Sequence, residues 1–527
     1  MKYCYFSIVI SSYRAPVLNH YLLFGWKYRG EGLSDVVLSK NHINPFQSQL
    51  EELDSKLVPI EGEAPSELKG TFFRIGPGRL HRGDEYYNHP FDGDGMIFKV
   101  TFSDNGIFYR NRHVLTKEYL KEEEAQRLLY RSVGTVPKKL KLRMRFFIIK
   151  NPANTNIVYH SHKLLALWEG GMPHLINPVT LETISKYDFS GKLKARFSFL
   201  PKLNLREVPF TAHPKKIPND DNLYGFGVTY GIGSKLTLYK IDSAGDMTVI
   251  RKISLKKRYL IHDFIVTKNY FLFFLGGPHI NLKLSNVIGN ESIIASMNSR
   301  ESEDGRVLLV SRKCHDVKFY DAVPGFIFHF ANGYEDADGN VVFDASFWRS
   351  FPVFTQNIFK NNSSELCRFT LCTASGNVDK EILFRGNTDF PAINPTVCGR
   401  QHRYAWFVCW GDSDSEGRSI IKFDCFNKSV LSHSFDNDLP EEPVFVAKQG
   451  AVKEDDGWLI FKVYVEKLHC TDIVVLNADD LSMVCRLRLP HHIPMGMHHC
   501  WINEVMLYPM DFKMHRDGKG VNPREHR

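Results

Sequence analysis

Beyond residue 65 the chain alternates between short apolar runs and turn-forming residues. Runs rich in Ile, Val, Phe, Tyr and Leu are interrupted about every 8 to 15 residues by Gly, Asn, Asp or Pro, a spacing typical of successive β-strands and turns. Examples are the segments 70–76, 95–112, 163–171, 269–277 and 457–465. The pattern therefore predicts many short antiparallel strands.

Two local patterns refine this prediction. Asp104-Asn105-Gly106 separates two alternating runs and predicts a β-hairpin. Helical periodicity is convincing mainly over 115–130, where apolar positions recur at three and four residues. No linker or composition break divides the chain, so one propeller or large barrel is favoured over a string of domains. No repeat period is visible, and the number of blades cannot be counted from the pattern.

Composition narrows the class of protein. The 527 residues are 43% hydrophobic and 24% charged, which excludes disorder, collagen-like repeats and a small disulfide scaffold. The net charge of +8 is mild and does not indicate nucleic-acid binding. The aromatic share of 13% suits strands or an apolar ligand cavity. No apolar run is long enough to predict a transmembrane helix.

The ten cysteines and the N-terminus bear on the compartment. No two cysteines form a C-x-x-C pair, so they are interpreted as buried thiols in a reducing compartment. The first 30 residues carry four basic residues and no acid, which suits either an organellar transit peptide or an ordinary N-terminal arm. We expect an arm over 1–47 and a cytoplasmic location, with a plastid or mitochondrial one as the alternative.

Four histidines stand apart from the others because each ends a strand-like run among apolar or turn-forming residues. They are His213 in PFTAHPKK, His262 in YLIHDFIVT, His329 in FIFHFANGYED and His498 in HHIPMGMHHCW. In such a place a strand can deliver an imidazole to a shared axis. Their separations match no local metal motif, so spacing alone leaves them as core histidines or ligands.

The sequence motifs around these histidines resemble those of the carotenoid cleavage oxygenase family, and most closely those of its apocarotenoid-cleaving branch. The resemblance is colinear from residue 70 to residue 501. It runs through GTFFRIGPG (70–78), HPFDGDGM (89–96), KNPANTNIVY (150–159), LALWEGGMPHLINPVTLET (165–183), DFPAINP (389–395), EEPVFV (441–446), EDDGW (454–458) and HHIPMGMHHCW (491–501).

The resemblance implies an all-β fold over residues 48–503, followed by a tail over 504–527. The fold would be a seven-bladed β-propeller with a cap of helices and loops over its iron-bearing face. His213, His262, His329 and His498 would bind one Fe(II) per chain, with O2 as co-substrate. Neutral imidazoles suit Fe(II), and four of them leave coordination positions open.

The family also implies carboxylates that orient the ligand rings. Glu169 and Glu442 match the family glutamates, whereas the third position holds the shorter Asp389. We expect the Asp389 contact to lengthen, to pass through water or to require a backbone shift, and so to weaken the site. His499 replaces a family glycine, and we expect it either to face solvent or to pack beside Trp501.

Two acidic motifs are interpreted as structural turns. Asp92 and Asp94 lie between glycines and could bind calcium, but no twelve-residue loop ending in Glu follows, so a tight turn is favoured. The EDDGW motif (454–458) is interpreted as a capped hairpin turn.

Residues 138–150 alternate basic and apolar side chains. A strand with one solvent-exposed face explains this alternation. A basic and apolar surface segment that contacts an anionic membrane explains it equally well. The family resemblance places this region near the mouth of the substrate tunnel. Peripheral membrane contact is therefore expected. The basic members are Lys139, Lys141, Arg143 and Arg145, and the apolar members are Leu140, Leu142, Met144 and Phe146.

The resemblance implies an Fe(II)-dependent dioxygenase that cleaves a conjugated double bond of a carotenoid or apocarotenoid to aldehyde or ketone products, as in retinal formation. An aromatic tunnel that includes Trp168 would select the bond. The alternatives are a stilbene-cleaving oxygenase of the same family and a weakly active or non-catalytic carotenoid-binding homologue. The sequence indicates neither the natural substrate nor the oligomeric state.

Overall fold

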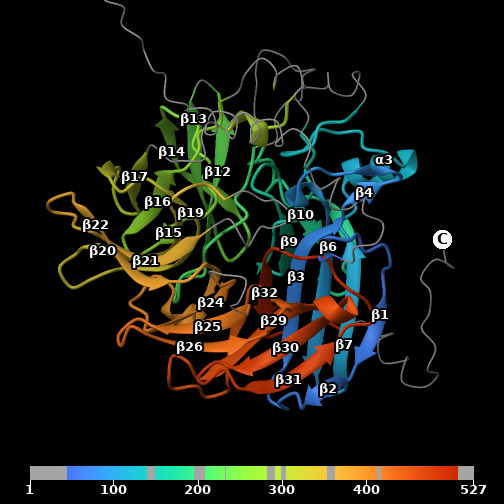
Figure 1. The fold of residues 1–527 in the computed structure, drawn as a ribbon. Helices are drawn as coiled ribbons and strands as arrows, with labels where there is room; N and C mark the ends of the chain where they lie inside the picture. Colours follow the sequence, from blue (N-terminus) through green and yellow to red (C-terminus); the bar gives the residue numbers. More distant parts are fainter. Residues whose placement is uncertain are drawn as a thin grey trace, which may run out of the picture.

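The computed structural model describes residues 44–138, 149–194, 208–231, 233–281, 286, 291–297, 304–352, 363–411 and 417–507. Seven antiparallel sheets follow one another around a common centre, and each sheet is one blade of a propeller (Figure 1). The predicted all-β fold and its seven blades are confirmed. Within the described ranges, no helix is long and apolar enough to cross a membrane.

The blades are built from the following strands. The first contains β1 (Asp54–Leu57), β3 (Gly70–Arg79), β6 (Asp94–Ser103), β7 (Gly106–His113) and β32 (His499–Ile502). The second contains β8 (Asn156–His160), β9 (Lys163–Leu167), β10 (His174–Ile176) and β11 (Thr183–Lys186). The third contains β12 (Leu223–Tyr230), β13 (Ser234–Ile241) and β14 (Met247–Leu255), and the fourth contains β15 (Ile265–Val266), β16 (Tyr270–Gly276), β17 (Gly305–Ser311) and β18 (Val317–Asp321).

The remaining blades continue in chain order. The fifth contains β19 (Phe326–Glu335), β20 (Val341–Trp348), β21 (Ser364–Leu371) and β22 (Val378–Arg385). The sixth contains β23 (Thr388–Ala392), β24 (Tyr404–Cys409), β25 (Ser419–Asp424) and β26 (Ser429–Ser434). The seventh contains β2 (Pro59–Gly62), β27 (Leu439–Pro440), β28 (Val444–Ala447), β29 (Gly457–Val465), β30 (Cys470–Asn477) and β31 (Met483–Arg488).

A few short elements complete the described chain. A small ribbon pairs β4 (His81–Arg82) with β5 (Glu85–Tyr86), and α3 (Lys117–Ala125) is the one α-helix whose bounds are described. The 3-10 helices are η1 (Pro90–Asp92), η2 (Ile294–Ser296), η3 (Pro395–Val397) and η4 (Glu466–Leu468).

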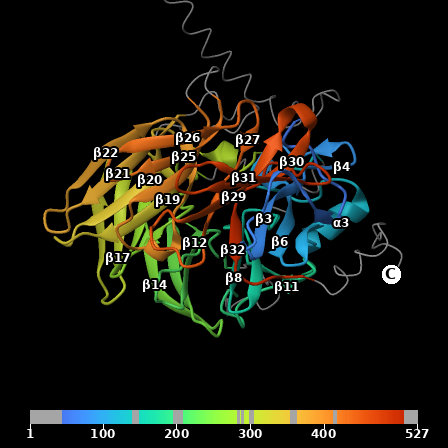
Figure 2. The ribbon, with the colours of Figure 1, turned by 90° about the horizontal axis from the view of Figure 1, so that it is seen from below.

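The ring is closed by strands from both ends of the fold. The last strand, β32, pairs with β3 of the first blade, and β2 from the N-terminal part pairs with β31 of the seventh blade. Figure 2 shows β32 beside β3. Because these two pairings join distant parts of the chain, they hold the first and seventh blades together by backbone hydrogen bonds.

The hydrophobic core is divided into clusters between neighbouring blades. Seven clusters each combine side chains of two adjacent blades, and a smaller eighth cluster lies around Phe328. At the closing junction, Phe72 and Phe98 of the first blade pack with Trp458 and Ile473 of the seventh. A central strand is therefore covered on both faces, which explains why every residue of β3 is buried.

The two local predictions hold with changed boundaries. The hairpin forms between β6 and β7, and Gly106 takes a φ of 119° that favours glycine. The predicted helix over 115–130 is shorter, because α3 begins after Thr116, whose hydroxyl accepts a hydrogen bond from the Tyr119 amide at 3.0 Å. It ends at Gln126, whose φ is 46°.

Asp94 belongs to a fully buried ionic cluster beneath α3. Its carboxylate contacts Arg82 at 2.7 Å and the Lys150 ammonium at 2.6 Å. Lys150 also contacts Glu122 of α3 at 2.5 Å, and the Tyr87 hydroxyl donates to the same carboxylate at 2.9 Å. Asp94 is therefore a structural residue. Lys150 is buried too, which corrects the end of the 138–150 segment predicted to contact a membrane. The basic and apolar residues of 139–148 lie outside the described residues.

Asp92 and the EDDGW motif also have structural roles. Asp92 accepts hydrogen bonds from the Thr135 hydroxyl at 2.6 Å and the Gly134 amide at 3.1 Å, and burial raises its pKa to about 6. Glu454 accepts the Tyr404 amide at 2.8 Å, and Asp455 pairs with Lys422 at 2.6 Å. These contacts support the turn interpretation over the calcium site.

The nine cysteines in the described ranges are all free. Most are buried or half-buried, but Cys314 is exposed, so the expectation of buried thiols is wrong for that residue.

Replacing Lys150 with Met should strongly destabilise the protein. The change leaves Asp94 and Glu122 without their shared cation in a fully buried place, which costs about 3–5 kcal/mol of the free energy of unfolding. Urea denaturation measures this loss. The control is Lys69→Met, which removes an exposed pair with Asp104 and should change stability by less than about 1 kcal/mol. Equal effects would contradict a structural role for the cluster.

Candidate metal centre

Four histidines from four blades meet at the centre of the propeller. His213 precedes β12, His262 precedes β15, His329 lies within β19 and His498 directly precedes β32. The sequence predicted each histidine at the end of a strand, whereas the structure places three of them in segments that lead into a strand and His329 within one. Three of the four are buried and His262 is partly exposed.

The four rings offer their nitrogens to one small volume. One ligand atom from each ring lies within 4.8 Å of every other. The Nε2 atoms of His213 and His262 are 2.9 Å apart, and the ring centroids of His213 and His498 are 4.3 Å apart. Sequence reasoning placed these residues together only through the family resemblance, and the geometry now does so directly.

Three carboxylates hold three of the rings from behind. Glu169 Oε1 lies 3.0 Å from the Nδ1 of His262, and Glu442 Oε1 lies 3.0 Å from the Nδ1 of His498. Asp389 Oδ1 lies 2.8 Å from the Nδ1 of His329. A carboxylate at Nδ1 fixes the tautomer and turns the Nε2 lone pair toward the centre.

Every blade contributes one residue to this arrangement. Glu169 follows β9 of the second blade, Asp389 lies in β23 of the sixth, and Glu442 lies between β27 and β28 of the seventh. In blade order from the first to the seventh, the residues are His498, Glu169, His213, His262, His329, Asp389 and Glu442.

Asp389 contacts His329 directly at 2.8 Å. The expectations of a longer contact and of a bridging water are therefore wrong. The backbone at this residue is irregular: the β23–β24 register shifts between Asp389 and Ala392, and Phe390 takes a left-handed φ of 54°. Oδ1 also accepts the Phe390 amide at 2.8 Å. With this backbone the shorter side chain reaches its histidine directly, so the expected weakening has no support in this distance.

His499 does not face solvent. Its side chain is only 12% exposed, and its ring packs on Phe72 with centroids 5.8 Å apart. Its Nε2 lies 3.3 Å from Glu442 Oε2, the oxygen that does not contact His498. The expectation that His499 faces solvent is therefore wrong: the ring stands behind the carboxylate that orients a ligand.

The electrostatics keep two of the rings neutral. Burial, reinforced by the neighbouring imidazoles, holds the pKa of His213 and of His498 well below its usual range. Burial also lowers the pKa of His329, but the facing Asp389 carboxylate outweighs it and the net direction is upward. Burial would raise the pKa of Glu169, yet His262 outweighs it, so this carboxyl stays ionised.

The residues present fit a divalent cation. The Nε2 of His329 is buried and has no hydrogen-bond partner among the described residues. Within the same ranges, histidines are the only ion-pair partners of Glu169, Asp389 and Glu442, so no Lys or Arg balances their charge. Converging imidazole nitrogens backed by uncompensated carboxylates are the donor set of a metal such as Fe(II).

Aromatic rings surround the centre, and sequence reasoning missed most of them. Phe328 lies 5.6 Å from the His262 ring and Phe390 lies 5.0 Å from the His329 ring, centroid to centroid. Trp410 stacks edge-on against Phe390 at 6.0 Å. Both phenylalanines are neighbours of predicted residues in the sequence, and that adjacency was the available signal. Trp168, the predicted tunnel residue, is half-buried, and its ring occupies the space that a side chain at Gly170 would need.

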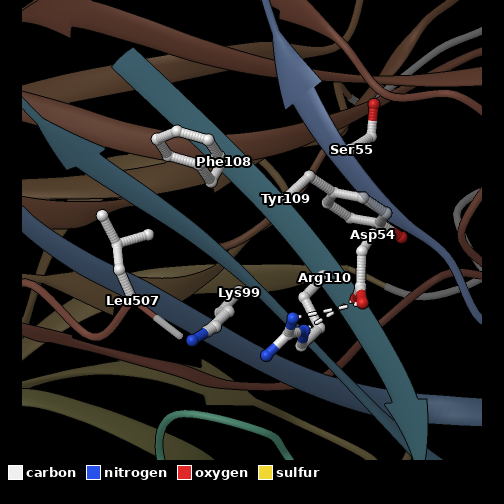
Figure 3. Close-up of a pocket in the computed structure, with 7 residues that line it drawn as sticks. All are labelled: Asp54, Ser55, Lys99, Phe108, Tyr109, Arg110 and Leu507. Carbon is white, nitrogen blue, oxygen red and sulfur yellow. Dashed lines mark hydrogen bonds and ion pairs between the residues drawn. The ribbon is translucent and has the colours of Figure 1, made fainter. Parts of the chain in front are cut away.

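Two other features carry less chemistry. A shallow pocket on the first blade is lined by Lys99, Arg110 and Asp54, but Arg110 is paired with Asp54 at 2.7 Å (Figure 3). Asp344, His402 and Cys425 form a second buried group of metal-ligand types. There, Arg368 binds both oxygens of Asp344 at 2.8 and 2.7 Å, and burial raises the pKa of the Cys425 thiol. These contacts account for the group without a metal.

Fold and site together define a class of protein: a seven-bladed β-propeller with a four-histidine centre held by carboxylates. A protein-family model described as retinal pigment epithelial membrane protein matches residues 46–503. The chain is 32% identical to the apocarotenoid-15,15'-oxygenase of Synechocystis sp. over 477 residues, covering 86% of this chain and 95% of that protein.

Further relatives and solved structures agree. Identity is 28% to carotenoid 9,10(9',10')-cleavage dioxygenase 1 of Arabidopsis thaliana, covering 86% of this chain and 87% of that protein. It is 27% to resveratrol cleavage oxygenase 1 of Aspergillus fumigatus, covering 86% and 93%. The cobalt-substituted Synechocystis apocarotenoid oxygenase superposes with a TM-score of 0.79 at 31% identity, covering 87% of this chain and 97% of that one.

The chain therefore belongs to the retinal pigment epithelial membrane protein family, which contains the carotenoid cleavage oxygenases. This membership makes the protein a cleavage dioxygenase.

Lengthening Asp389 should not strengthen metal binding. In Asp389→Glu the extra methylene must fit a buried site whose backbone already suits the shorter acid, so we expect lower or unchanged affinity. Asp389→Ala should lose about 10- to 100-fold, because the His329 ring is no longer oriented. Competition with a chelator measures both. A tighter site in Asp389→Glu would show that the aspartate is a weakening substitution after all.

Proposed function

We propose that the protein is a non-haem Fe(II)-dependent dioxygenase that cleaves one conjugated double bond of an apocarotenoid or carotenoid. Retinal-type aldehydes are among its expected products. The reaction breaks one C=C bond and forms two C=O bonds, and O2 supplies both oxygen atoms, so no external reductant is required. When bound, the iron would supply the activation of dioxygen.

The observation that carries this proposal is the set of four inward-facing imidazoles with carboxylates behind three of them. His213, His262, His329 and His498 would hold one ion and leave positions free for O2 or substrate. Glu169, Asp389 and Glu442 orient the rings. Phe328 and Phe390 form apolar walls that exclude water from the centre.

The centre is more accessible on one side. The side chains of Glu169 and His262 are 29% and 11% exposed, whereas those of Asp389 and His329 are 4% and 7% exposed. Glu169, on the more exposed side, directly follows Trp168 in the sequence. An elongated apolar substrate would therefore approach past Glu169 and His262, and we propose Trp168 as part of the tunnel that positions its double bond.

A stilbene is the second candidate substrate class, because a relative at 27% identity is named a resveratrol cleavage oxygenase. The identity to the apocarotenoid oxygenase is higher, at 32%. Parallel assays with an apocarotenal and with resveratrol separate these classes, and a non-catalytic carotenoid-binding protein would consume O2 with neither.

The wild-type protein should retain about one iron per chain and consume O2 with an apocarotenal. His329→Ala should lose both properties, because it removes a ligand nitrogen that has no other partner. Metal analysis and an oxygen electrode measure them. His433→Ala is the matched control, since this histidine contacts the Leu481 carbonyl between β30 and β31, away from the centre. Wild-type iron content in His329→Ala would overturn the ligand assignment.

We further propose that the protein works in the cytoplasm, at a membrane surface, with plastid or mitochondrial import as the alternative location. The support is the pattern of Lys139, Lys141, Arg143 and Arg145 among apolar residues, together with a substrate class that dissolves in membranes.

Neutralising these four basic residues should reduce co-sedimentation with anionic liposomes, and added salt should do the same. Each could contribute on the order of 1 kcal/mol near anionic headgroups. Turnover of a detergent-solubilised apocarotenal should survive the change. Binding that ignores both salt and charge removal would refute this contact.

A further inference from the structure

One buried carboxylate touches no ligand ring, yet it contacts the neighbours of three ligands. Asp263 directly follows His262, and its side chain is 1% exposed. Its Oδ1 accepts the Phe264 amide at 2.8 Å and lies 2.7 Å from the Lys215 ammonium. Its Oδ2 accepts the Phe330 amide at 3.0 Å.

The partners of Asp263 stand beside metal ligands in the chain. Lys215 is two residues after His213, and Phe330 immediately follows His329. Lys215 is itself fixed, because its backbone exchanges two hydrogen bonds with Tyr224 at 2.8 and 2.9 Å. One carboxylate therefore ties together the segments that carry His213, His262 and His329.

Strand pairing cannot supply this link. The three segments lead into or form β12, β15 and β19, which belong to three separate sheets. His498 differs, because its own backbone is held directly: its amide donates to the Thr155 carbonyl at 3.2 Å and its carbonyl accepts the Ile75 amide at 3.1 Å.

The chemistry of the Asp263 contacts is selective for an ionised carboxylate. All three partners are donors, and they approach both oxygens. An amide in its place would turn an NH2 group toward at least one N–H donor, whichever way it is oriented. The Lys215 ammonium pairs with this buried carboxylate at 2.7 Å and offsets its charge.

We propose that Asp263 is a positioning residue that sets the relative placement of His213, His262 and His329 across three blades. The inference rests on the proposed metal-binding function. Its consequence is that metal affinity and coordination geometry depend on a carboxylate whose partners among the described residues are two backbone amides and a lysine.

The test compares Asp263→Asn with Asp472→Asn in the full-length protein. Asp472 is equally buried and pairs with Arg486 at 2.6 Å and Arg488 at 2.9 Å, but it lies on β30. Co(II) is the probe, because its visible absorption reports ligand geometry. Affinity comes from chelator competition, and folding from near-UV circular dichroism and thermal melting.

We expect Asp263→Asn to weaken Co(II) binding by about tenfold or more and to change the Co(II) spectrum. Asp472→Asn should lower the melting temperature while leaving affinity and spectrum as in the wild type. Lys215→Met is a milder second variant that keeps both amide contacts, and it should weaken binding less than Asp263→Asn.

The outcomes separate the two proposals. A wild-type protein that binds no Co(II) or iron would refute the proposed function itself. A wild type that binds metal, with Asp263→Asn folded and equal to it in affinity and spectrum, would overturn the positioning role alone. If Asp263→Asn does not fold, wild-type affinity and spectrum in Lys215→Met would overturn that role, and weakened binding would support it.

Discussion

The structure depends on bringing four imidazole nitrogens within 4.8 Å of one another in a buried place. Such a group is unfavourable unless each ring keeps a fixed tautomer and the inward lone pairs meet a cation. The propeller meets this requirement because seven blades share one axis. Each blade contributes one ligand or one orienting carboxylate, so a displaced blade would disturb the centre.

Buried charge shows the same division between scaffold and site. Asp94 and Asp472, two buried acids of the scaffold, are paired with Lys or Arg. Among the described residues, those at the centre are paired with histidines alone. The scaffold therefore balances its own charge, and the centre keeps a negative charge that a divalent cation can neutralise. Without a cation, no positive charge other than that of the histidines would offset these carboxylates among the described residues.

The sequence predicted the strands well because a strand covered by neighbours on both faces is rich in apolar residues, as in β29. It predicted the ligands only through motifs that resemble those of the family, because His213 and His498 are brought together by closure of the propeller and not by their spacing in the sequence. The short Asp389 contact could not be predicted, because the φ of Phe390 is a backbone property that residue identity does not specify. The contacts of Asp263 were missed because two of its three partners are backbone amides, which leave no mark in the sequence.

The pair Glu441 and Glu442 shows why position within a strand-like segment decides a residue's role. Extended backbone points successive side chains to opposite sides. Glu442 contacts His498 at 3.0 Å, whereas Glu441 contacts Arg74 at 2.5 Å and Lys462 at 2.6 Å. Arg74 also donates to the Met497 carbonyl at 3.0 Å, next to the ligand His498. The two identical residues thus stabilise the same ligand by different routes: Glu442 orients its ring, and Glu441 anchors the arginine that holds its backbone.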